Sequence, residues 1–413
     1  MAAVLTERTR QYSDASNSHF VNLVEYIGRA LEPTATQLSA LERSYDSTSA
    51  FLVECSEFES ELLEVHPQGS RELGTLIRPL RGGDGFDVDL VARFDRKAHA
   101  RYSSQGPVEL VDRLYRAVKR YADQHGLTLK KWERCVTLEY ADGMCADIAP
   151  VIDSPVHHAL YGDTHGLIPD RNRRTFDPTN PKGLARYFNG IAAIQPVFSR
   201  TILAKAATED FKRADVTPLS NAEDVFDRLL CRVIQIIKLH RDTTFAKSPD
   251  LIDQAPSSIF LTALAAGAYA RQAPLLHADP LALFIDIVRD MPDFIDRISI
   301  GTREEWQVPN PTAPGDNLAS AMNSGSRQQI FNQWHRKFGN DIVAIVDAIE
   351  SRSGMDQVGE LVAGAFGERA GKALINGQLN AQEKQRNAGA AKAVLAGGLI
   401  LPLTAKSNTF YGE

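Results

Sequence analysis

The order of apolar and polar positions divides the chain into a mixed first part and a helical second part. Before residue 180, segments with apolar residues every three or four positions are interspersed with short segments that alternate apolar and polar residues. The first pattern predicts helices with one buried face, and the second predicts half-buried strands. The predicted order is helices over 17–31 and 36–63, strands over 64–67 and 86–94, a helix over 107–125, and strands over 127–140 and 144–152.

Beyond residue 180 the helical period continues. The predicted helices are 181–207, 222–241, 257–271, 280–290 and 326–351, followed by a loosely helical polar segment over 367–387. This order predicts an α+β protein of two lobes with a cleft between them. We expect a mixed sheet with helices in residues 1–175, a helical lobe in residues 176–405, and a polar tail in residues 406–413.

Three aspartates lie in the predicted strands. Asp87 and Asp89 are two positions apart in one strand, so they project from the same face, about 6.5–7 Å apart along the backbone. Asp147 lies in an otherwise apolar strand, where an ionised carboxylate needs a partner. Carboxylates gathered on one face can hold a pair of divalent cations for chemistry at phosphorus. Asp153, at the exit of the same strand as Asp147, is the alternative third ligand.

A Gly69-Ser70 turn follows the predicted strand 64–67 and precedes Asp87 by seventeen residues, counted from Ser70. Such a turn offers backbone amides and a hydroxyl group to phosphate. A phosphate-binding turn followed by an Asp-x-Asp strand and a third aspartate indicates a nucleotidyl transferase.

This order of motifs resembles the polymerase-β-like nucleotidyltransferase superfamily. The segments 68–75, 167–170, 236–242 and 308–312 further resemble the cGAS/DncV-like nucleotidyltransferases (CD-NTases) of bacterial anti-phage (CBASS) signalling. The resemblance covers roughly residues 15–350. It implies a bilobal polymerase-β-like core with a helical C-terminal lobe. It also implies an enzyme that condenses ATP and/or GTP into a cyclic oligonucleotide second messenger, such as the cyclic dinucleotide cyclic GMP-AMP.

The resemblance assigns roles to individual residues. It implies two Mg²⁺ ions, with Mn²⁺ as a substitute, on Asp87, Asp89 and Asp147. It implies that the nucleotides are bound by Gln68, Gly69, Ser70, Lys238, Ser257, Ser258 and Asn310. Some of these residues have simpler interpretations. Lys238 could be a solvated cation near a helix C-terminus, one of the two serines could cap a helix, and Asn310 could only brace a loop.

Composition narrows the choice of partner. The 413 residues have a formal net charge of −6, which argues against a surface that coats long nucleic acid. Local basic groups remain, namely Arg71, Arg78 and Arg81, and later Arg171, Arg173 and Arg174. The four cysteines show no Cys-x-x-Cys spacing, and the sequence shows neither a membrane span nor an apolar signal segment. We expect a cytoplasmic enzyme.

Two other functions stay open at this point. One is a template-free synthase of linear oligonucleotides, and the other is a catalytically silent scaffold that binds nucleotides. The three aspartates argue against the scaffold, because folding alone does not require them. For the tail 406–413 the resemblance implies capture by accessory regulatory or conjugating proteins, and the alternative is a frayed terminus without a role.

Overall fold

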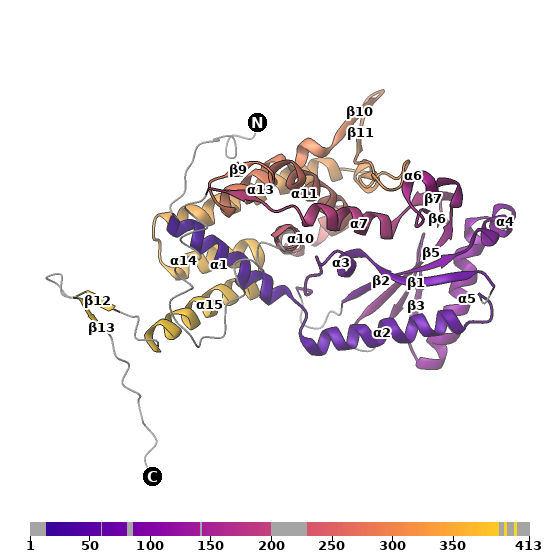
Figure 1. The fold of residues 1–413 in the computed structure, drawn as a ribbon, viewed down its shortest axis with the longest axis horizontal. Coiled ribbons are helices and arrows are strands. Elements are labelled where there is room, and N and C mark those ends of the chain that lie inside the picture. The colour runs from indigo at the N-terminus through magenta and orange to yellow at the C-terminus, as the bar shows by residue number, and fades with distance from the viewer. Residues whose placement is uncertain are drawn as a thin grey trace, which may run out of the picture.

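Two hydrophobic cores organise the chain, one beneath a β-sheet and one among helices. The structure, a computed structural model, describes residues 14–58, 60–80, 86–140, 143–199, 229–387, 392–394 and 400–402. Figure 1 shows the sheet and its helices on the right and the helical assembly on the left. The predicted tail 406–413 lies outside the described residues.

The first part of the chain forms a seven-stranded mixed sheet. Five strands follow the order β1-β2-β5-β4-β3; β6 pairs with the end of β5, and β7 pairs with β6. Strands β2 and β5 are parallel, and the other pairs of the sheet are antiparallel. The strands are β1 (Leu62–Gln68), β2 (Asp87–Phe94), β3 (Thr128–Lys131), β4 (Val136–Glu139), β5 (Cys145–Asp153), β6 (Gly166–Asp170) and β7 (Thr175–Thr179). The helices are α1 (Asp14–Leu31), α2 (Ala35–Glu54), α3 (Gly69–Glu72), α4 (Arg96–Gln105), α5 (Pro107–His125) and α6 (His158–Tyr161).

The alternation of side chains in β2 decides which face of the sheet carries the aspartates. Because successive residues of a strand point to opposite faces, the even positions of β2 enter the core together with α2, α4 and α5. These positions are Val88, Leu90, Ala92 and Phe94. In β5, Ala146 and Ile148 join the same core. The odd positions, with Asp87, Asp89 and Asp147, therefore project from the opposite face.

The second part is helical and surrounds α10, a helix that is buried along most of its length. Its helices are α7 (Pro181–Ala192), α10 (Leu229–Ala246), α11 (Ser258–Gln272), α12 (Pro280–Asp290), α13 (Arg327–Glu350), α14 (Met355–Phe366) and α15 (Glu368–Asn387). Short strand pairs accompany them: β8 (Val197–Phe198) with β9 (Leu276–His277), β10 (Asp296–Ile300) with β11 (Arg303–Gln307), and β12 (Lys392–Val394) with β13 (Ile400–Pro402).

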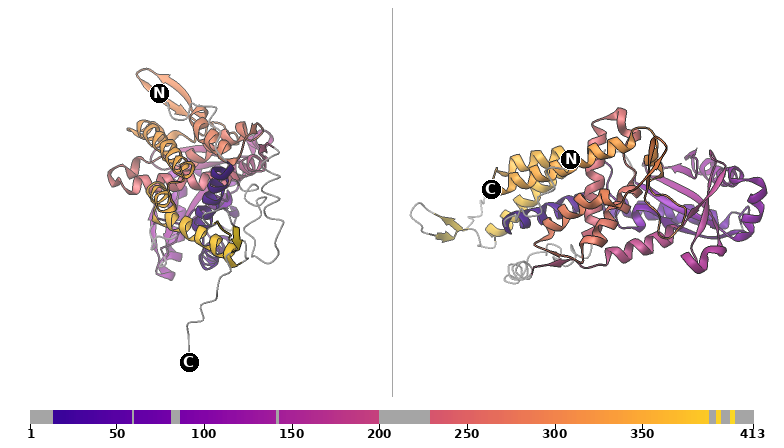
Figure 2. Two further views of the ribbon diagram at one scale, coloured as in Figure 1. Left: turned by 90° about the vertical axis from the view of Figure 1, so that its left-hand side faces the viewer. Right: turned by 90° about the horizontal axis from the view of Figure 1, so that it is seen from above.

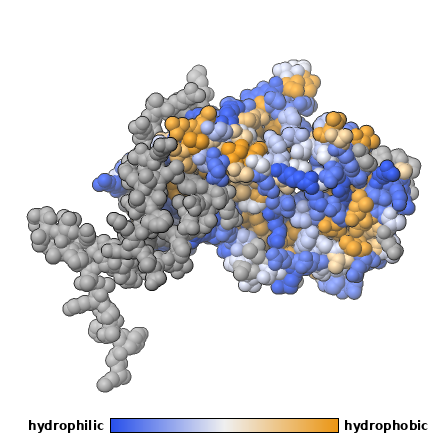
Figure 3. Space-filling model, viewed as in Figure 1, coloured by the Kyte–Doolittle hydropathy of each residue, from blue (hydrophilic) through white to orange (hydrophobic). Residues whose placement is uncertain are grey.

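The β10–β11 hairpin projects from the body of the molecule (Figure 2). Apolar side chains gather at its tip (Figure 3), where Ile298 and Ile300 are exposed. In the described part of the chain no helix is long and apolar enough to cross a membrane.

The predicted α+β, bilobal architecture is confirmed, but several predicted elements end elsewhere. The helix expected over 36–63 stops at Glu54, where a turn brings Phe58 back into the core. The strand expected over 127–140 is two strands, β3 and β4, which pair with each other. The helix expected over 181–207 ends at Ala192, because Pro196 disfavours helical backbone in the residue before it.

Helix α1 packs in the helical lobe, although the sequence placed it in the first lobe. Its buried side chains Phe20, Leu23 and Ile27 belong to the same core as α10, α12 and α13. The apolar stripe of α1 shows only that one face is covered and does not show which element covers it. The predicted domain boundaries near residues 175 and 405 stay predictions.

The packing of α1 can be tested by truncating Ile27, which is fully buried. Ile27→Ala should lower the free energy of unfolding by about 2–5 kcal/mol, because it removes buried methyl groups and leaves a cavity. Val53→Ala is the control, since Val53 on α2 is 60% exposed, and should change it by no more than about 0.5 kcal/mol. Chemical denaturation measures both, and equal effects would contradict the placement of α1.

Candidate active site

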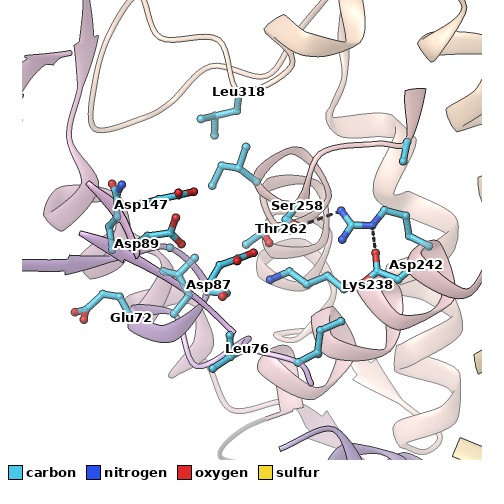
Figure 4. A pocket seen from close by; sticks show the side chains of 18 of the residues that line it. Glu72, Leu76, Asp87, Asp89, Asp147, Lys238, Asp242, Ser258, Thr262 and Leu318 are labelled. Carbon is cyan, nitrogen blue, oxygen red and sulfur yellow. Dashed lines mark hydrogen bonds and ion pairs between the residues drawn. The ribbon is translucent and has the colours of Figure 1, made fainter. Parts of the chain in front are cut away.

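Neighbouring strands bring the three aspartates together at one place on the sheet. Asp89 of β2 lies beside Asp147 of β5 in the parallel register, and Gln68 of β1 lies opposite Asp89 on the other side. Figure 4 shows the carboxyl groups of Asp87, Asp89 and Asp147 extending from the strands toward the helices that carry Lys238 and Ser258. The predicted carboxylate cluster is therefore present as a spatial cluster.

The turn after β1 comes very close to Asp89. Gly69 has a positive φ of 70°, and a Cβ atom built on it would lie 1.9 Å from Oδ2 of Asp89. Only glycine leaves room for this carboxyl group and also adopts this backbone conformation without strain. Ser70, the next residue, lines the same cavity.

The environment of the aspartates disfavours their charge. Burial raises the pKa of Asp89 to about 7, and the nearby carboxylates of Asp147 and Asp87 add to the effect. Desolvation by the cleft also raises the pKa of Asp87 and of Asp147, while a hydrogen bond donated by the Thr137 hydroxyl to Asp147 opposes the rise. A cation bound among these groups would relieve their mutual repulsion.

The donor set fits a divalent cation, because hard carboxylate oxygens are the ligands that Mg²⁺ prefers. Among the described residues no three His, Cys, Asp or Glu side chains already have the spacing of metal ligands. The aspartates would therefore have to rotate toward a shared ion. Asp153 is not available for this role, because it pairs with Arg93 and with His158.

The facing wall belongs to the helical lobe. Lys238 on α10 is only 4% exposed, so it is not a solvated cation at a helix end. Its Nζ donates hydrogen bonds to the backbone oxygen of Thr75 (3.2 Å) and to the Thr75 hydroxyl (3.1 Å). Burial, followed by the nearby charge of Arg241, lowers the pKa of Lys238 to about 8.

The two predicted serines differ in position. Ser258 lines the cavity, and its hydroxyl accepts a hydrogen bond from Arg241 at 3.0 Å. Ser257 occupies the N-cap position of α11, without a side-chain capping bond, and does not line the cavity. Because residues at a helix start point in different directions, only one of the two can face the cleft.

Asn310 also lines the cavity, but its side chain is engaged within its own loop. Its Nδ2 donates to Asp316 (2.9 Å), and its Oδ1 accepts from the backbone and hydroxyl of Thr312 (3.0 and 2.8 Å). Burial raises the pKa of Asp316, whereas the bond from Asn310 lowers it. Asn310 thus both braces the loop and contributes to the wall.

The cavity between the two walls has a volume of about 1090 Å³. It contains all of the residues predicted to bind metal or nucleotide except Ser257: Gln68, Gly69, Ser70, Asp87, Asp89, Asp147, Lys238, Ser258 and Asn310. The sequence analysis did not identify two further residues of the site: Thr137, whose hydroxyl donates to Asp147, and Asp316, which lines the cavity. A hydroxyl on the strand next to Asp147 could have been noticed from the strand pattern, but Asp316 lies in a loop without periodicity.

Several predicted basic groups are neutralised outside the cavity. Arg173 pairs with Asp170 and Asp177, and Arg71 pairs with Glu42 at 3.3 Å. Arg81 lies outside the described residues.

Comparisons with known proteins all find synthases of nucleotide second messengers. The profile of the SMODS family, described as Second Messenger Oligonucleotide or Dinucleotide Synthetase domain, matches residues 17–190. A c-di-GMP synthase of Roseivirga ehrenbergii is 24% identical over 395 residues, covering 94% of this chain and 96% of that protein. The cyclic dinucleotide synthase CdnG of Bradyrhizobium diazoefficiens is 24% identical over 410 residues, covering 92% and 91%.

The solved structure of that CdnG in complex with GTP has the same fold, with a TM-score of 0.60 and 18% identity over 87% of this chain and 99% of that one. The chain is therefore a nucleotidyltransferase of the class that synthesises cyclic oligonucleotides. Residues 17–190 match the SMODS family, and nearly the whole chain is similar to cyclic dinucleotide synthases, in agreement with the resemblance of its motifs to the cGAS/DncV-like nucleotidyltransferases. The nucleotidyltransferase superfamily generally uses divalent metal ions.

The close approach of Gly69 and Asp89 predicts that Gly69→Ala displaces the Asp89 carboxyl group. We expect nucleotidyl transfer to fall about a hundredfold, the effect of misplacing a reacting group by about 1 Å. Gly126→Ala is the matched control, because Gly126 has a similar φ of 65° and nothing within 4 Å of its added Cβ. Both variants should lose about 1–2 kcal/mol of stability to backbone strain. Loss of activity in both, measured at equal folded fraction, would contradict the role of the contact.

The raised pKa of Asp89 predicts that the metal-free protein loses stability as the pH rises. This carboxyl group binds its proton more tightly in the folded state, with a pKa of about 7 against 3.8. Its stabilising contribution is therefore full at low pH and is lost as the pH rises through about 7. Asp89→Asn removes this loss, so its Tm should fall less than that of the wild type.

Thermal unfolding in EDTA from about pH 5 to about pH 7.5 measures the difference. The range stops there because Lys238, with a pKa lowered to about 8, stabilises the fold as the pH rises further and obscures the trend. Asp163→Asn, at an exposed position, is the control and should follow the wild type. Identical pH profiles for the wild type and Asp89→Asn would show that Asp89 titrates normally.

Proposed function

We propose that this enzyme uses two Mg²⁺ ions to join GTP, alone or with ATP, into a cyclic dinucleotide that serves as a cytoplasmic signal in anti-phage defence. The observation that carries the proposal is the cluster of Asp87, Asp89 and Asp147 facing Lys238 across one large cavity. The name of one relative, a c-di-GMP synthase, and the solved complex of CdnG with GTP support a guanine-containing dinucleotide.

Both walls of the cavity would contribute to binding the triphosphate, and the wall with the aspartates would also carry the chemical step. Ser70 and the backbone of Gly69 on one side, and Lys238 on the other, would hold the triphosphate between the lobes. Asp147, held by the Thr137 hydroxyl, has a raised pKa and is suited to accept the proton of the attacking ribose hydroxyl. The hydroxyl oxygen bonds to the α-phosphorus as the bond to pyrophosphate breaks.

The divalent cations, when bound by the aspartates, would supply stabilisation of the charge that develops on the phosphate oxygens. The cavity volume of about 1090 Å³ leaves room for an acceptor nucleotide beside the donor. Cyclisation requires a second transfer of the same kind, with the linear intermediate reversed in the cavity. Ser258 and Asn310 lie on the wall that an acceptor base would face, and we assign them to nucleotide binding; Ser257 would act only indirectly.

The proposal is tested by incubating the enzyme with labelled GTP and ATP and Mg²⁺. The expected product is resistant to phosphatase, and mass spectrometry gives its bases. Asp147→Asn should reduce its formation about 10²–10⁴-fold, the range for loss of a general base, without lowering the Tm. Asp163→Asn changes an exposed aspartate that does not line the cavity; it is the control and should retain full activity.

The other possible functions give different results in the same assay. A synthase of linear oligonucleotides would leave products from which phosphatase removes the terminal phosphates. A silent scaffold would bind nucleotide and release no pyrophosphate. Full synthesis by Asp147→Asn would contradict the assignment of the three aspartates.

A further inference from the structure

A second, smaller cavity lies behind the active site, on the opposite side of α10. Its volume is about 270 Å³, and it is enclosed by α1, α10, the junction of α14 and α15, and the segment 73–80, which we call the strap. The helices that enclose it lie side by side (Figure 1). Leu80 and Ala246 line both cavities, so the two share a wall.

Three cationic side chains line this second cavity. Arg78 donates to the backbone oxygen of Glu32 at 2.8 Å, Arg369 to that of Pro79 at 3.0 Å, and Lys247 to that of Gly364 at 2.6 Å. These bonds hold the cations in place, but backbone oxygens do not neutralise them. Burial and the charge of Arg78 lower the pKa of Arg369.

Charge compensation is missing at these cations. In the described part of the chain none of the three forms an ion pair with a carboxylate, although the protein has a net charge of −6. Glu368 is the one carboxylate among the described lining residues, and it is exposed. Elsewhere in this chain partly buried arginines such as Arg93 and Arg113 pair with acids.

Two polar groups of the cavity wall also lack partners. The Thr243 side chain is 4% exposed, and its Oγ1 has no hydrogen-bond partner among the described residues. The same is true of the buried Nε of Arg78. Buried polar groups are almost always hydrogen-bonded. Helix α15 begins at Glu368 beside Thr243, and the oxygen of Gly367 accepts from the N–H groups of Ala370 (3.0 Å) and Gly371 (3.3 Å). The N–H groups of the two preceding residues, at the very start of the helix, have no acceptor within the helix.

We propose that this cavity is a second anion site, which binds a phosphate group. Planar guanidinium groups, an ammonium group, a hydroxyl and a helix start are the donors that phosphate oxygens take up together. The phosphate can be inorganic phosphate, the pyrophosphate that nucleotidyl transfer releases, or part of a small phosphate monoester. In the last case the apolar side chains of Leu31, Leu239 and Phe366 would pack against its organic part.

Occupancy of this site would act on the active site from behind. The strap presents Arg78 to the second cavity and Leu76, Ile77 and Pro79 to the first. Helix α10 also lines both cavities: Thr243 faces the second cavity, and Lys238 faces the first. An anion that bridges Arg78 and Arg369 would fasten the strap to the helical lobe without touching the aspartates.

The test is a calorimetric titration of the full-length protein with inorganic phosphate, pyrophosphate and GMP at constant ionic strength. A saturating non-hydrolysable GTP analogue occupies the active-site cavity, and the variants of the second cavity distinguish binding there from binding elsewhere. We expect one anion per chain for the wild type and at least tenfold weaker binding for Arg369→Gln. Thr243→Val, which keeps the shape and removes the hydroxyl, should bind severalfold more weakly.

Arg336→Gln is the matched control, because Arg336 is exposed and also donates to a backbone oxygen, that of Asn332. It should bind as the wild type does. Unchanged binding in Arg369→Gln and Thr243→Val, absence of saturable binding in the wild type, or an equal loss in Arg336→Gln would overturn the proposal. The tightest of the three probes identifies the source of the phosphate.

Folding is checked in the same samples by thermal unfolding. Without anion, Arg369→Gln should have a Tm at least equal to that of the wild type, because it removes one of two neighbouring like charges. With phosphate, the wild type should gain several degrees and Arg369→Gln almost none. An equal gain in both proteins would place the anion elsewhere.

Discussion

The rest of the structure depends on the docking of the strap, residues 73–80, against one polar stripe of α10. Cys231, Gln235 and Lys238 are three or four positions apart, so they lie on one face of the helix. They contact the backbone oxygens of Leu73 (3.4 Å), Leu76 (3.0 Å) and Thr75 (3.2 Å), in that order. A polar stripe on an otherwise buried helix thereby donates hydrogen bonds to the backbone of an irregular segment that follows the Gly69-Ser70 turn.

This contact fixes both walls of the active site relative to each other. The strap continues from Gly69 and Ser70, which stand beside the aspartates, and α10 carries Lys238 and Arg241 to the facing side. The same helix and strap also form the second cavity. A small displacement of the strap would change the width of the catalytic cavity and the spacing of the cations behind it.

The active site itself is electrostatically unfavourable for the free protein. Asp89 is held near a pKa of about 7 beside Asp87 and Asp147, while burial lowers the pKa of Lys238 to about 8. Both shifts mean that the folded protein disfavours the charged form of the group, so each group lowers the stability of the fold when it is charged. Such local conflicts are expected where function requires charge in a partly buried place. Nucleotide and cation are the partners that would resolve them in the proposed function.

The sequence by itself determined the type of many elements and predicted that three aspartates lie in strands of one sheet. Helices α5 and α12 have the predicted bounds, because a proline begins each and, for α5, Gly126 ends it. The alternation in β2 also predicted which face carries Asp87 and Asp89. Only the tertiary structure decided that α1 joins the helical core, that Thr137 holds Asp147, and that Ser258 rather than Ser257 reaches the cleft. The physical reason is that periodicity shows which face of an element is covered, whereas the partner that covers it comes from distant parts of the chain.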